Sequence, residues 1–447
     1  MRRRPNNKIH TFVKKICLLL ALLLAEKLAA QTPTQPPTLT PDEAVRLALE
    51  ANYDIRIVRG DAEIARLNNT RANAGMLPVV NFVASDNASL NSFQQKLANG
   101  SEFSALGAPF NTASAGVQLS WTLFDGGRMS ITKNRLERLE ALGQINLQAA
   151  VLQTATAVLT AYYDIVRARL QIRASEELIT LNAERLRIAE ARLTAGMAAQ
   201  TDALQAKVDL NQRKSDLLNQ QNTLSAAKRT LNRLLVRPPE TAFEVVENLA
   251  SSYAPDAPAL LQKMLAQNPG LLSLQKSTEV AALTVDEART LNRARLTGIG
   301  QFNAVRSDNG SGFLLNNTQA GLTVGASLVI PLYTGGNAKR QVDVAKVAAQ
   351  QSQLRLENQR TALETELSNQ LAFFQTQRDV LALENENIAN ARESLNVSTE
   401  RFRLGQTNAL EVQSAQNNLE QALTRQNLVE YNLKMAEIQL RLLAGEI

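Results

Sequence analysis

The feature that most constrains this chain is an internal duplication, because two copies of one sequence plan lie about 209 residues apart. Three pairs of short segments align at this single spacing: 121–127 with 330–336, 192–196 with 401–405, and 231–234 with 440–443. An earlier pair, 44–52 and 259–268, is offset by about 216, so the first copy has about seven extra residues after it. The sequence predicts repeats at about 39–235 and 259–445, joined by a connector at 236–258.

Long stretches without proline or glycine predict very long helices. Residues 337–404 contain neither residue, and residues 128–195 contain only Gly143. At 1.5 Å per residue, each stretch permits a helix of roughly 100 Å. Gly196 and Gly405 end these stretches, since glycine favours the left-handed conformation that follows a helix. Return helices are predicted at 201–235 and 408–443.

Shorter helices are predicted near the start of each copy, at 54–76 and 271–295. One of these together with a return helix nearly matches the length of a long helix. The economical arrangement therefore places two short helices end to end beside each long one.

Between the first helices and the glycine pair of each copy, the hydrophobic period changes to two, which is typical of strands. Apolar residues alternate with Ser, Gly, Gln and Thr in 113–122 and in 319–330, and weaker strands precede both. The predicted strands are 79–90, 111–122, 296–306 and 318–331. The intervening segments, 91–110 and 307–317, are rich in Gly, Asn and Ser and are predicted as hairpin loops.

The strand length fits a tilted transmembrane β-strand, although a half-buried sheet of a soluble protein gives the same alternation. In lipid, four strands leave two unpaired edges, so a membrane-spanning sheet must close on itself. Two, three or four copies would supply eight, twelve or sixteen strands. The membrane interpretation therefore demands a homo-oligomer, and the periodicity does not choose its number.

The first 30 residues have the features of a secretory signal peptide, with basic residues before an apolar run at 16–25. This leader contains seven of the 48 Lys and Arg residues and one of the 42 Asp and Glu residues, so the remainder has 41 of each. The high pI of the whole chain thus does not indicate a nucleic-acid partner.

The leader also contains the only cysteine, Cys17, and the only histidine, His10. Residues 31–447 therefore lack the side chains for a disulfide, a thiolate nucleophile, an imidazole base or a Cys/His metal site. We predict no catalytic residue, no metal, no cofactor and no enzymatic activity.

Three segments, 39–52, 123–127 and 192–206, resemble recurrent motifs of the TolC-type outer-membrane efflux protein family. Their order, doubling and spacing extend the resemblance over essentially all of 31–447. The resemblance implies an α+β membrane protein of Gram-negative bacteria. A homotrimer would close a 12-stranded β-barrel in the outer membrane, and its long helices would form a coiled-coil α-barrel in the periplasm.

The function implied by the resemblance is a passive exit duct of a tripartite efflux or type I secretion system. Such a duct would contact outer-membrane lipid, a periplasmic adaptor and an inner-membrane pump, and no nucleic acid. A soluble periplasmic coiled-coil scaffold or adaptor is the alternative, with the strands in a small folded sheet. An enzyme is a distant third, because only carboxylates would remain for its chemistry.

The resemblance also places the docking site for the adaptor at the two glycine turns, which would be the periplasmic tips. Ordinary helix-terminating turns explain the same residues. The expected docking residues are Gly196, Met197, Ala198, Thr201, Asp202, Gly405, Gln406, Thr407 and Asn408.

Beyond the second tip, Glu411 falls on the first of two acidic positions that ring the closed pore mouth in the family, and Ser414 falls on the second. Three such carboxylates would favour cations, whereas the plain alternative is a solvated helix carboxylate. The family's polar lock across the mouth is incomplete here, because Phe402 and Thr407 replace its aromatic hydroxyl and its arginine, while Asp202 keeps the acid.

The aromatic residues Trp121, Phe124 and Tyr333 lie where strands are predicted to meet helices. This is the position of the aromatic belt at a membrane interface. Packing at a strand end is the alternative explanation.

Overall fold

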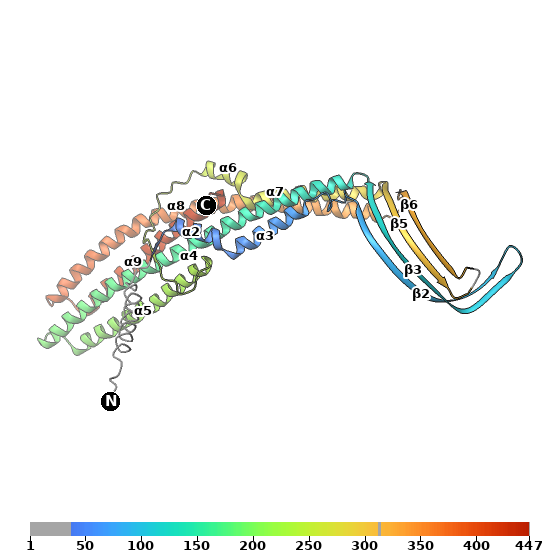
Figure 1. The fold of residues 1–447 in the computed structure, drawn as a ribbon. Helices are drawn as coiled ribbons and strands as arrows, with labels where there is room; N and C mark the ends of the chain where they lie inside the picture. The colour runs from blue at the N-terminus through green and yellow to red at the C-terminus, as the bar shows by residue number, and fades with distance from the viewer. Residues whose placement is uncertain (1–36, 312–313, 447) are drawn as a thin grey trace, which may run out of the picture. The chain divides into compact units, whose positions relative to one another are not determined.

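The computed structural model describes residues 37–311 and 314–446 (Figure 1). The predicted signal peptide, with His10 and Cys17, lies outside these residues. The two copies have the same order of elements. The first contains α2 (Pro41–Ala51), α3 (Tyr53–Asn68), β2 (Val79–Lys96), β3 (Glu102–Phe124), α4 (Arg128–Thr194) and α5 (Gln200–Leu234). The second contains α6 (Ala257–Gln267), α7 (Pro269–Arg289), β5 (Arg295–Asn309), β6 (Asn316–Val329), α8 (Asn337–Arg403) and α9 (Ala409–Ala444).

The chain divides into two compact units, and the continuous helix α4 contributes to both. One unit combines the described part of 1–47 with 161–249, and the other combines 48–160 with 250–446. The first contains α5, the second half of α4 and a small parallel pair of β1 (Thr38–Leu39) with β4 (Glu244–Val245).

Tyr162 fixes the connector in the first unit. Its buried hydroxyl donates to the carbonyl of Leu39 and accepts from the backbone N–H of Val246, both at 2.9 Å. The side-chain amide of Asn232 donates to the carbonyls of Pro239 and Thr241. These hydrogen bonds hold the start of the connector against α4 and α5.

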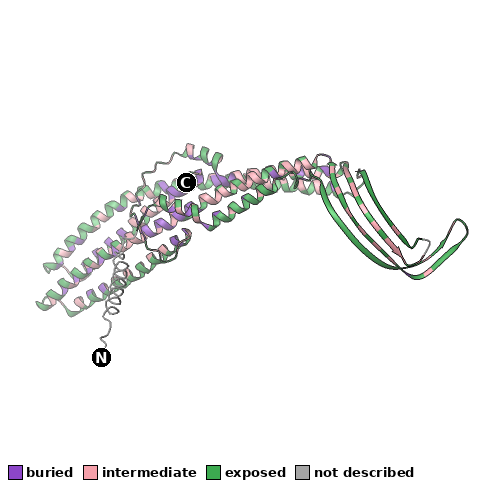
Figure 2. Cartoon of the chain, in the orientation of Figure 1, coloured by how far each residue is buried: buried purple, intermediate pink, exposed green. Residues whose placement is uncertain are grey.

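In the second unit, α7 and α9 both pack along α8, and α6 packs against α9. Figure 2 shows buried residues interspersed with intermediate and exposed ones along the helices. A hydrophobic core of the unit is built from Leu260, Met264, Leu271, Leu363, Leu367, Phe374, Leu433, Ala436, Leu440, Leu443 and Ala444. This arrangement agrees with the expectation of two short helices beside a long one.

The first helices are shorter than predicted. Helix α3 ends at Asn68 rather than Met76, because the side-chain amide of Asn73 donates to the Asn68 carbonyl and the chain turns. Helix α7 ends at Arg289, and β5 begins at Arg295. Gly143 in the middle of α4 has a packing reason, since a Cβ there would lie 3.2 Å from Cα of Ala62 in α3.

The four long strands form one antiparallel sheet in the order β2-β3-β5-β6. Both hairpins are longer than predicted. The predicted loop at 91–110 is largely paired strand, and only 97–101 connects β2 to β3. The prediction failed there because it treated Asn and Ser as loop signals, whereas backbone pairing does not depend on apolar side chains.

Candidate functional site

The sheet separates its side chains by polarity, and the strand register keeps this separation across all four strands. Phe82, Val117, Phe302 and Leu322 lie opposite one another in one row of the ladder. Because side chains alternate between faces, rows two residues away lie on the same side. This side, the apolar face, also carries Val80, Leu119, Trp121, Leu296, Val324 and Leu328.

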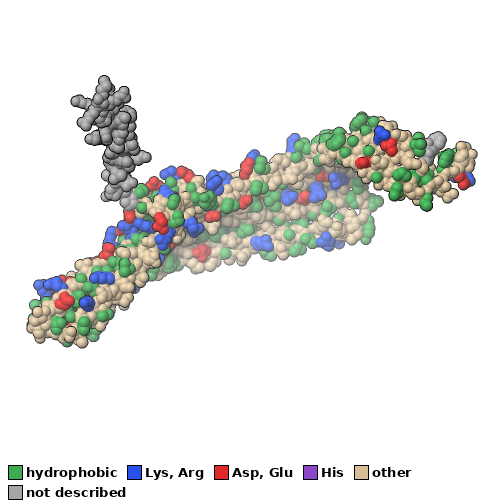
Figure 3. Space-filling view, turned by 60° about the horizontal axis from the view of Figure 1, so that its bottom comes forward, with side chains coloured by type: hydrophobic (Ala, Val, Ile, Leu, Met, Phe, Trp, Pro, Cys, Tyr) green, Lys and Arg blue, Asp and Glu red, His purple; other side chains and the backbone are tan. Residues whose placement is uncertain are grey.

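The other side, the polar face, carries mostly small and polar side chains, although it also contains Val79, Val83, Ile299 and Val305. In the outer rows, Asp86, Arg306 and Asp308 lie on the side of the apolar face. The rows of the polar face contain Asn81, Ser85, Ser114, Gly116, Gln118, Ser120, Gln301, Asn303, Gly321 and Thr323. Within the described residues, no element covers the apolar face, and Leu322 and Val324 are 73% and 78% exposed. Figure 3 shows charged side chains along the helices and few over the sheet. An uncovered apolar sheet face of this extent requires an apolar environment outside the chain.

The expected interfacial aromatics lie where the sheet meets the helices. The indole N–H of Trp121 donates to the carbonyl of Met76 at 3.0 Å, at the helix-side end of the apolar face. Phe124 is opposite Leu296, and its ring is half exposed. Tyr333 lies in the loop after β6 and is 88% exposed. All three are therefore available to an interface.

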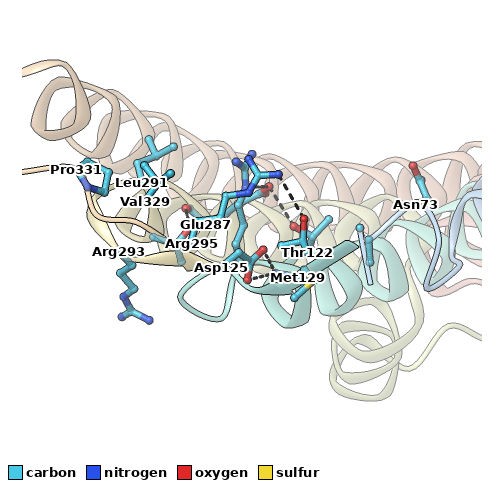
Figure 4. A pocket seen from close by; sticks show the side chains of 15 residues that line it. Asn73, Thr122, Asp125, Met129, Glu287, Leu291, Arg293, Arg295, Val329 and Pro331 are labelled. Carbon is cyan, nitrogen blue, oxygen red and sulfur yellow. Dashed lines mark hydrogen bonds and ion pairs between the residues drawn. The ribbon is translucent and has the colours of Figure 1, made fainter. Parts of the chain in front are cut away.

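The turn at residues 125–127 joins β3 to α4 (Figure 4). The Asp125 carboxylate accepts from the Met129 backbone N–H at 2.9 Å and so caps the helix. Gly126 has φ +72°, and a Cβ on it would meet the Arg293 side chain at 2.3 Å. The Arg293 guanidinium donates to the Gly126 carbonyl at 2.6 Å. These contacts make residues 125–127 a structural turn between the strand and the helix.

Around this turn lies a polar pocket of about 530 Å³. In its wall, the Glu287 carboxylate accepts from the Thr132 hydroxyl and pairs with Arg128 and Arg135 at 3.3 and 3.0 Å. The Glu287 charge is thus neutralised inside the pocket, which favours a structural role at the strand–helix junction. No group of three or more potential metal-binding side chains occurs in residues 37–311 and 314–446.

The two helical hairpins turn with the same backbone geometry. At the first tip, the N–H of Met197 donates to the Arg192 carbonyl, and Gly196 has φ +73°. At the second tip, the N–H of Gln406 donates to the Arg401 carbonyl, and Gly405 has φ +77°. This six-to-one bond with a left-handed glycine is the Schellman motif.

The second tip holds Glu411 in a dense set of contacts within its own hairpin. Its carboxylate pairs with Arg401 at 2.7 Å and accepts from the hydroxyls of Thr407 and Ser398. Its backbone N–H donates to the Asn408 side chain, which caps α9. Glu411 is therefore not a bare carboxylate, and its side chain is 38% exposed.

Sequence reasoning missed Arg401 and Ser398 as partners of Glu411. The only signal was that a hairpin turn at Gly405 brings the residues on either side of it together. Ser414 is exposed and does not join this cluster. Phe402 is buried in the hairpin, with 1% of its surface exposed.

Both tips expose apolar side chains as well as polar ones. Met197 and Leu204 are mostly exposed at the first tip, and Leu404 and Leu410 at the second. Among the expected docking residues, Gly196, Met197, Thr201, Gly405, Gln406 and Asn408 are exposed, whereas Ala198, Asp202 and Thr407 are partly buried.

Comparison with known proteins gives one consistent result. A family model described as "Outer membrane efflux protein" matches residues 44–236 and 260–446. A curated relative, the outer membrane efflux protein BepC of Brucella suis, is 24% identical over 316 residues, which are 69% of this chain and 66% of the relative.

Solved structures share the fold at low identity. The outer-membrane channel OprN has a TM-score of 0.78 at 18% identity, over 91% of this chain and 90% of that one. The outer membrane protein VceC of Vibrio cholerae has a TM-score of 0.76 at 16% identity, over 91% and 96%. The CmeC outer membrane channel of Campylobacter jejuni has a TM-score of 0.77 at 17% identity, over 91% and 85%.

Proposed function

Because the chain belongs to the outer membrane efflux protein family, we propose that three copies close an exit duct through the Gram-negative outer membrane. The four-stranded sheets of three protomers join into a 12-stranded barrel, and the helices extend into the periplasm. The duct is passive, and no catalytic residue takes part.

The observation that carries this proposal is the register of the sheet. In the rows nearer the helices, up to Ala84 of β2, it aligns apolar side chains on one face of all four strands and mostly polar or small side chains on the other. A barrel in a membrane needs this arrangement, with lipid outside and water inside. The edges β2 and β6 have no partner strand in the described chain, so pairing β6 of one protomer with β2 of the next satisfies both.

A soluble periplasmic scaffold is disfavoured by the same observation. Such a protein has to cover the apolar face with another element, and no described element does so. The unit of duplication supports the duct as well, since repeats at about 39–235 and 259–445 each contribute one β-hairpin to the sheet.

We further propose that the two helical tips bind a periplasmic adaptor, which connects the duct to an inner-membrane pump. The exposed Met197 and Leu404, beside polar backbone at Gly196 and Gly405, offer a mixed apolar and polar surface of the kind found at protein interfaces. Glu411 belongs to the pore mouth in this proposal, with its charge moderated by Arg401.

The test combines oligomer mass in detergent with planar-bilayer conductance of purified protein. Two single-cysteine variants, Gln118→Cys and Leu119→Cys, place a thiol on adjacent residues of β3 that face opposite sides. The only natural cysteine, Cys17, lies in the predicted leader, so the background is free of thiols after its removal.

We expect a trimer whose conductance falls when a charged methanethiosulfonate reagent modifies residue 118 and stays unchanged with the residue 119 variant. A monomer without conductance would overturn the proposal. Equal sensitivity of the two variants would contradict the assignment of the polar face to the lumen.

A further inference from the structure

The polarity of the two sheet faces reverses at the far end of the β2–β3 hairpin, which extends beyond the β5–β6 hairpin (Figure 1). Strand β2 continues without an inserted residue to Lys96, so its odd-numbered residues stay on the side of the polar face. Phe93 lies on that side, and Phe103, opposite Gln95, lies there too. The charged pair Lys96–Glu102 lies on the side of the apolar face.

Before this point, Asp86 and Arg306 already lie on the side of the apolar face, and the hairpin beyond them contains a β-bulge. The register shifts between Asn91 and Phe93, where β3 places an extra residue against Ser92. Gly107 adopts φ +65° in the bulge, and its N–H donates to the Ser92 hydroxyl at 3.1 Å. Bulges bend the strand in which they occur.

The direction of the bend follows from an aromatic contact. The rings of Phe93 and Phe110 lie 5.7 Å apart at 73°. Phe110 is opposite Ser89, four residues before Phe93, which is a separation of roughly 13 Å in a flat strand. Ala108 lies in the row between them and is only 5% exposed. The hairpin therefore bends toward the polar face and closes the two rings over Ala108.

The reach of this hairpin is comparable with the size of the pore. Twelve strands spaced about 4.8 Å apart and tilted by about 40° enclose a barrel of roughly 12 Å backbone radius. The arm from Asn91 to Lys96 spans five residue steps, about 17 Å. An arm of this length that bends toward the lumen reaches over the pore.

We infer that the β2–β3 hairpins of three protomers overhang the outer mouth of the duct and place Phe93, Phe103 and Phe110 there as an aromatic collar. This inference rests on the proposed function, because it takes the polar face as the lumen. The collar selects among solutes at the exit: it slows hydrated ions and holds aromatic, weakly hydrated solutes against the ring faces.

The experiment measures block of single-channel conductance by tetraphenylphosphonium added on the side of the hairpins. Phe103→Leu keeps an apolar side chain at an exposed position but removes the ring, so it folds like the parent chain. Phe93→Ser removes the ring contact with Phe110. The matched control is Leu90→Ser, because Leu90 is exposed in the same hairpin and lies on the opposite face.

We expect about tenfold weaker block in Phe103→Leu and Phe93→Ser, with higher ion conductance in Phe93→Ser, and unchanged block in Leu90→Ser. Block by tetrabutylammonium, an aliphatic cation, should not change in Phe103→Leu. Unchanged tetraphenylphosphonium block in Phe103→Leu, or an equal loss in Leu90→Ser, would overturn the collar. If the block is unchanged in Phe103→Leu but Gln118→Cys still responds to the thiol reagent, the collar is excluded while the proposed duct stands. The failure of the collar is therefore distinguishable from the failure of the proposed function.

Discussion

The two helical hairpins share a backbone turn but differ in how they hold charge beside it. At the spacing of 209, Arg401 and Glu411 correspond to Arg192 and Asp202, so both tips have a basic and an acidic residue in the same places. The three groups that support Glu411 are Ser398, Thr407 and Asn408, and the corresponding residues of the first copy are Ala189, Ala198 and Ala199.

The first hairpin has its strong ion pair deeper in the structure. Arg185 is buried and pairs with Asp209, and the corresponding positions of the second copy are Ser394 and Asn418. Both copies thus keep the glycine that the backbone turn requires, whereas their ion pairs lie at different positions. The second tip is polar and cross-linked, whereas the first relies on packing and a buried pair.

The largest effect that tests this difference is expected from Arg185→Met. Removal of the guanidinium leaves the Asp209 carboxylate in a largely buried place, which costs about 3–5 kcal/mol of unfolding free energy. The measurement is the midpoint of chemical unfolding. Arg187→Met is the control two residues away, because its pair with Glu184 is exposed and its loss should not be measurable.

The double variant Arg185→Met/Asp209→Leu should recover part of the lost stability, since no charge is left buried. A loss no larger than that of Arg187→Met would show that the first hairpin does not depend on its buried pair.

A smaller effect is expected from exchanging the helix caps. Asn408→Ala removes the side chain that caps α9 and should lower stability by about 1 kcal/mol. Ala199 occupies the equivalent position before α5 with extended backbone, φ −75° and ψ 148°, and has no side-chain cap. Ala199→Asn should therefore stabilise the first hairpin by a similar amount, as measured by thermal unfolding. A destabilising Ala199→Asn would mean that the two turns are not equivalent.

A pH-dependent effect should distinguish the second hairpin. The hydrogen bond from Arg425 is the main cause that holds the pKa of Glu384 below its ordinary value. Burial raises this pKa, and a hydrogen bond from Asn387 lowers it further. Because the folded-state pKa is the lower one, the stabilisation is present above the unfolded-state pKa and is lost as the pH falls through the folded-state value.

Arg425→Gln should therefore cost about 1 kcal/mol at neutral pH, and the difference from the parent chain should shrink below about pH 4. Unfolding midpoints measured between pH 3 and 7 check this. Arg360→Gln, which breaks an exposed pair with Glu364 on the same helix, serves as the control. A cost of Arg425→Gln that is independent of pH would contradict the role of Glu384.

The smallest effect on stability is expected at the tip, where Arg401→Gln frees the Glu411 carboxylate. The pair is about half exposed, so its loss should change the unfolding free energy by less than about 1 kcal/mol. In the proposed duct, however, the freed charge should raise cation selectivity, measured as reversal potential in a salt gradient. Arg403→Gln is the control, because Arg403 is exposed and its ion pair with Glu400 is long, at 3.9 Å. An equal shift in both variants would remove Glu411 from the pore mouth.

Features that repeat along the chain were predictable from the sequence, because they depend on local periodicity. The stretches without proline and glycine mark α4 and α8, and the alternation around Val117 and Leu322 marks the strands. The pairing of Arg401 with Glu411 was not predictable, because it depends on how two helices face each other after the turn. The β-bulge at Ser92 was hidden as well, since one extra residue in β3 does not alter the composition of the segment.

The unpaired edges of the sheet also govern how such a ring is made. In the proposed duct, strands β2 and β6 pair with other chains, and the apolar face contacts lipid. A single chain in the membrane therefore has no stable intermediate state before it pairs with neighbouring chains. Membrane insertion and association of the chains in the proposed duct are therefore coupled. The rate of this coupled step depends steeply on the local concentration of chains. The amount of protein that the cell synthesises then determines whether rings form or strands aggregate.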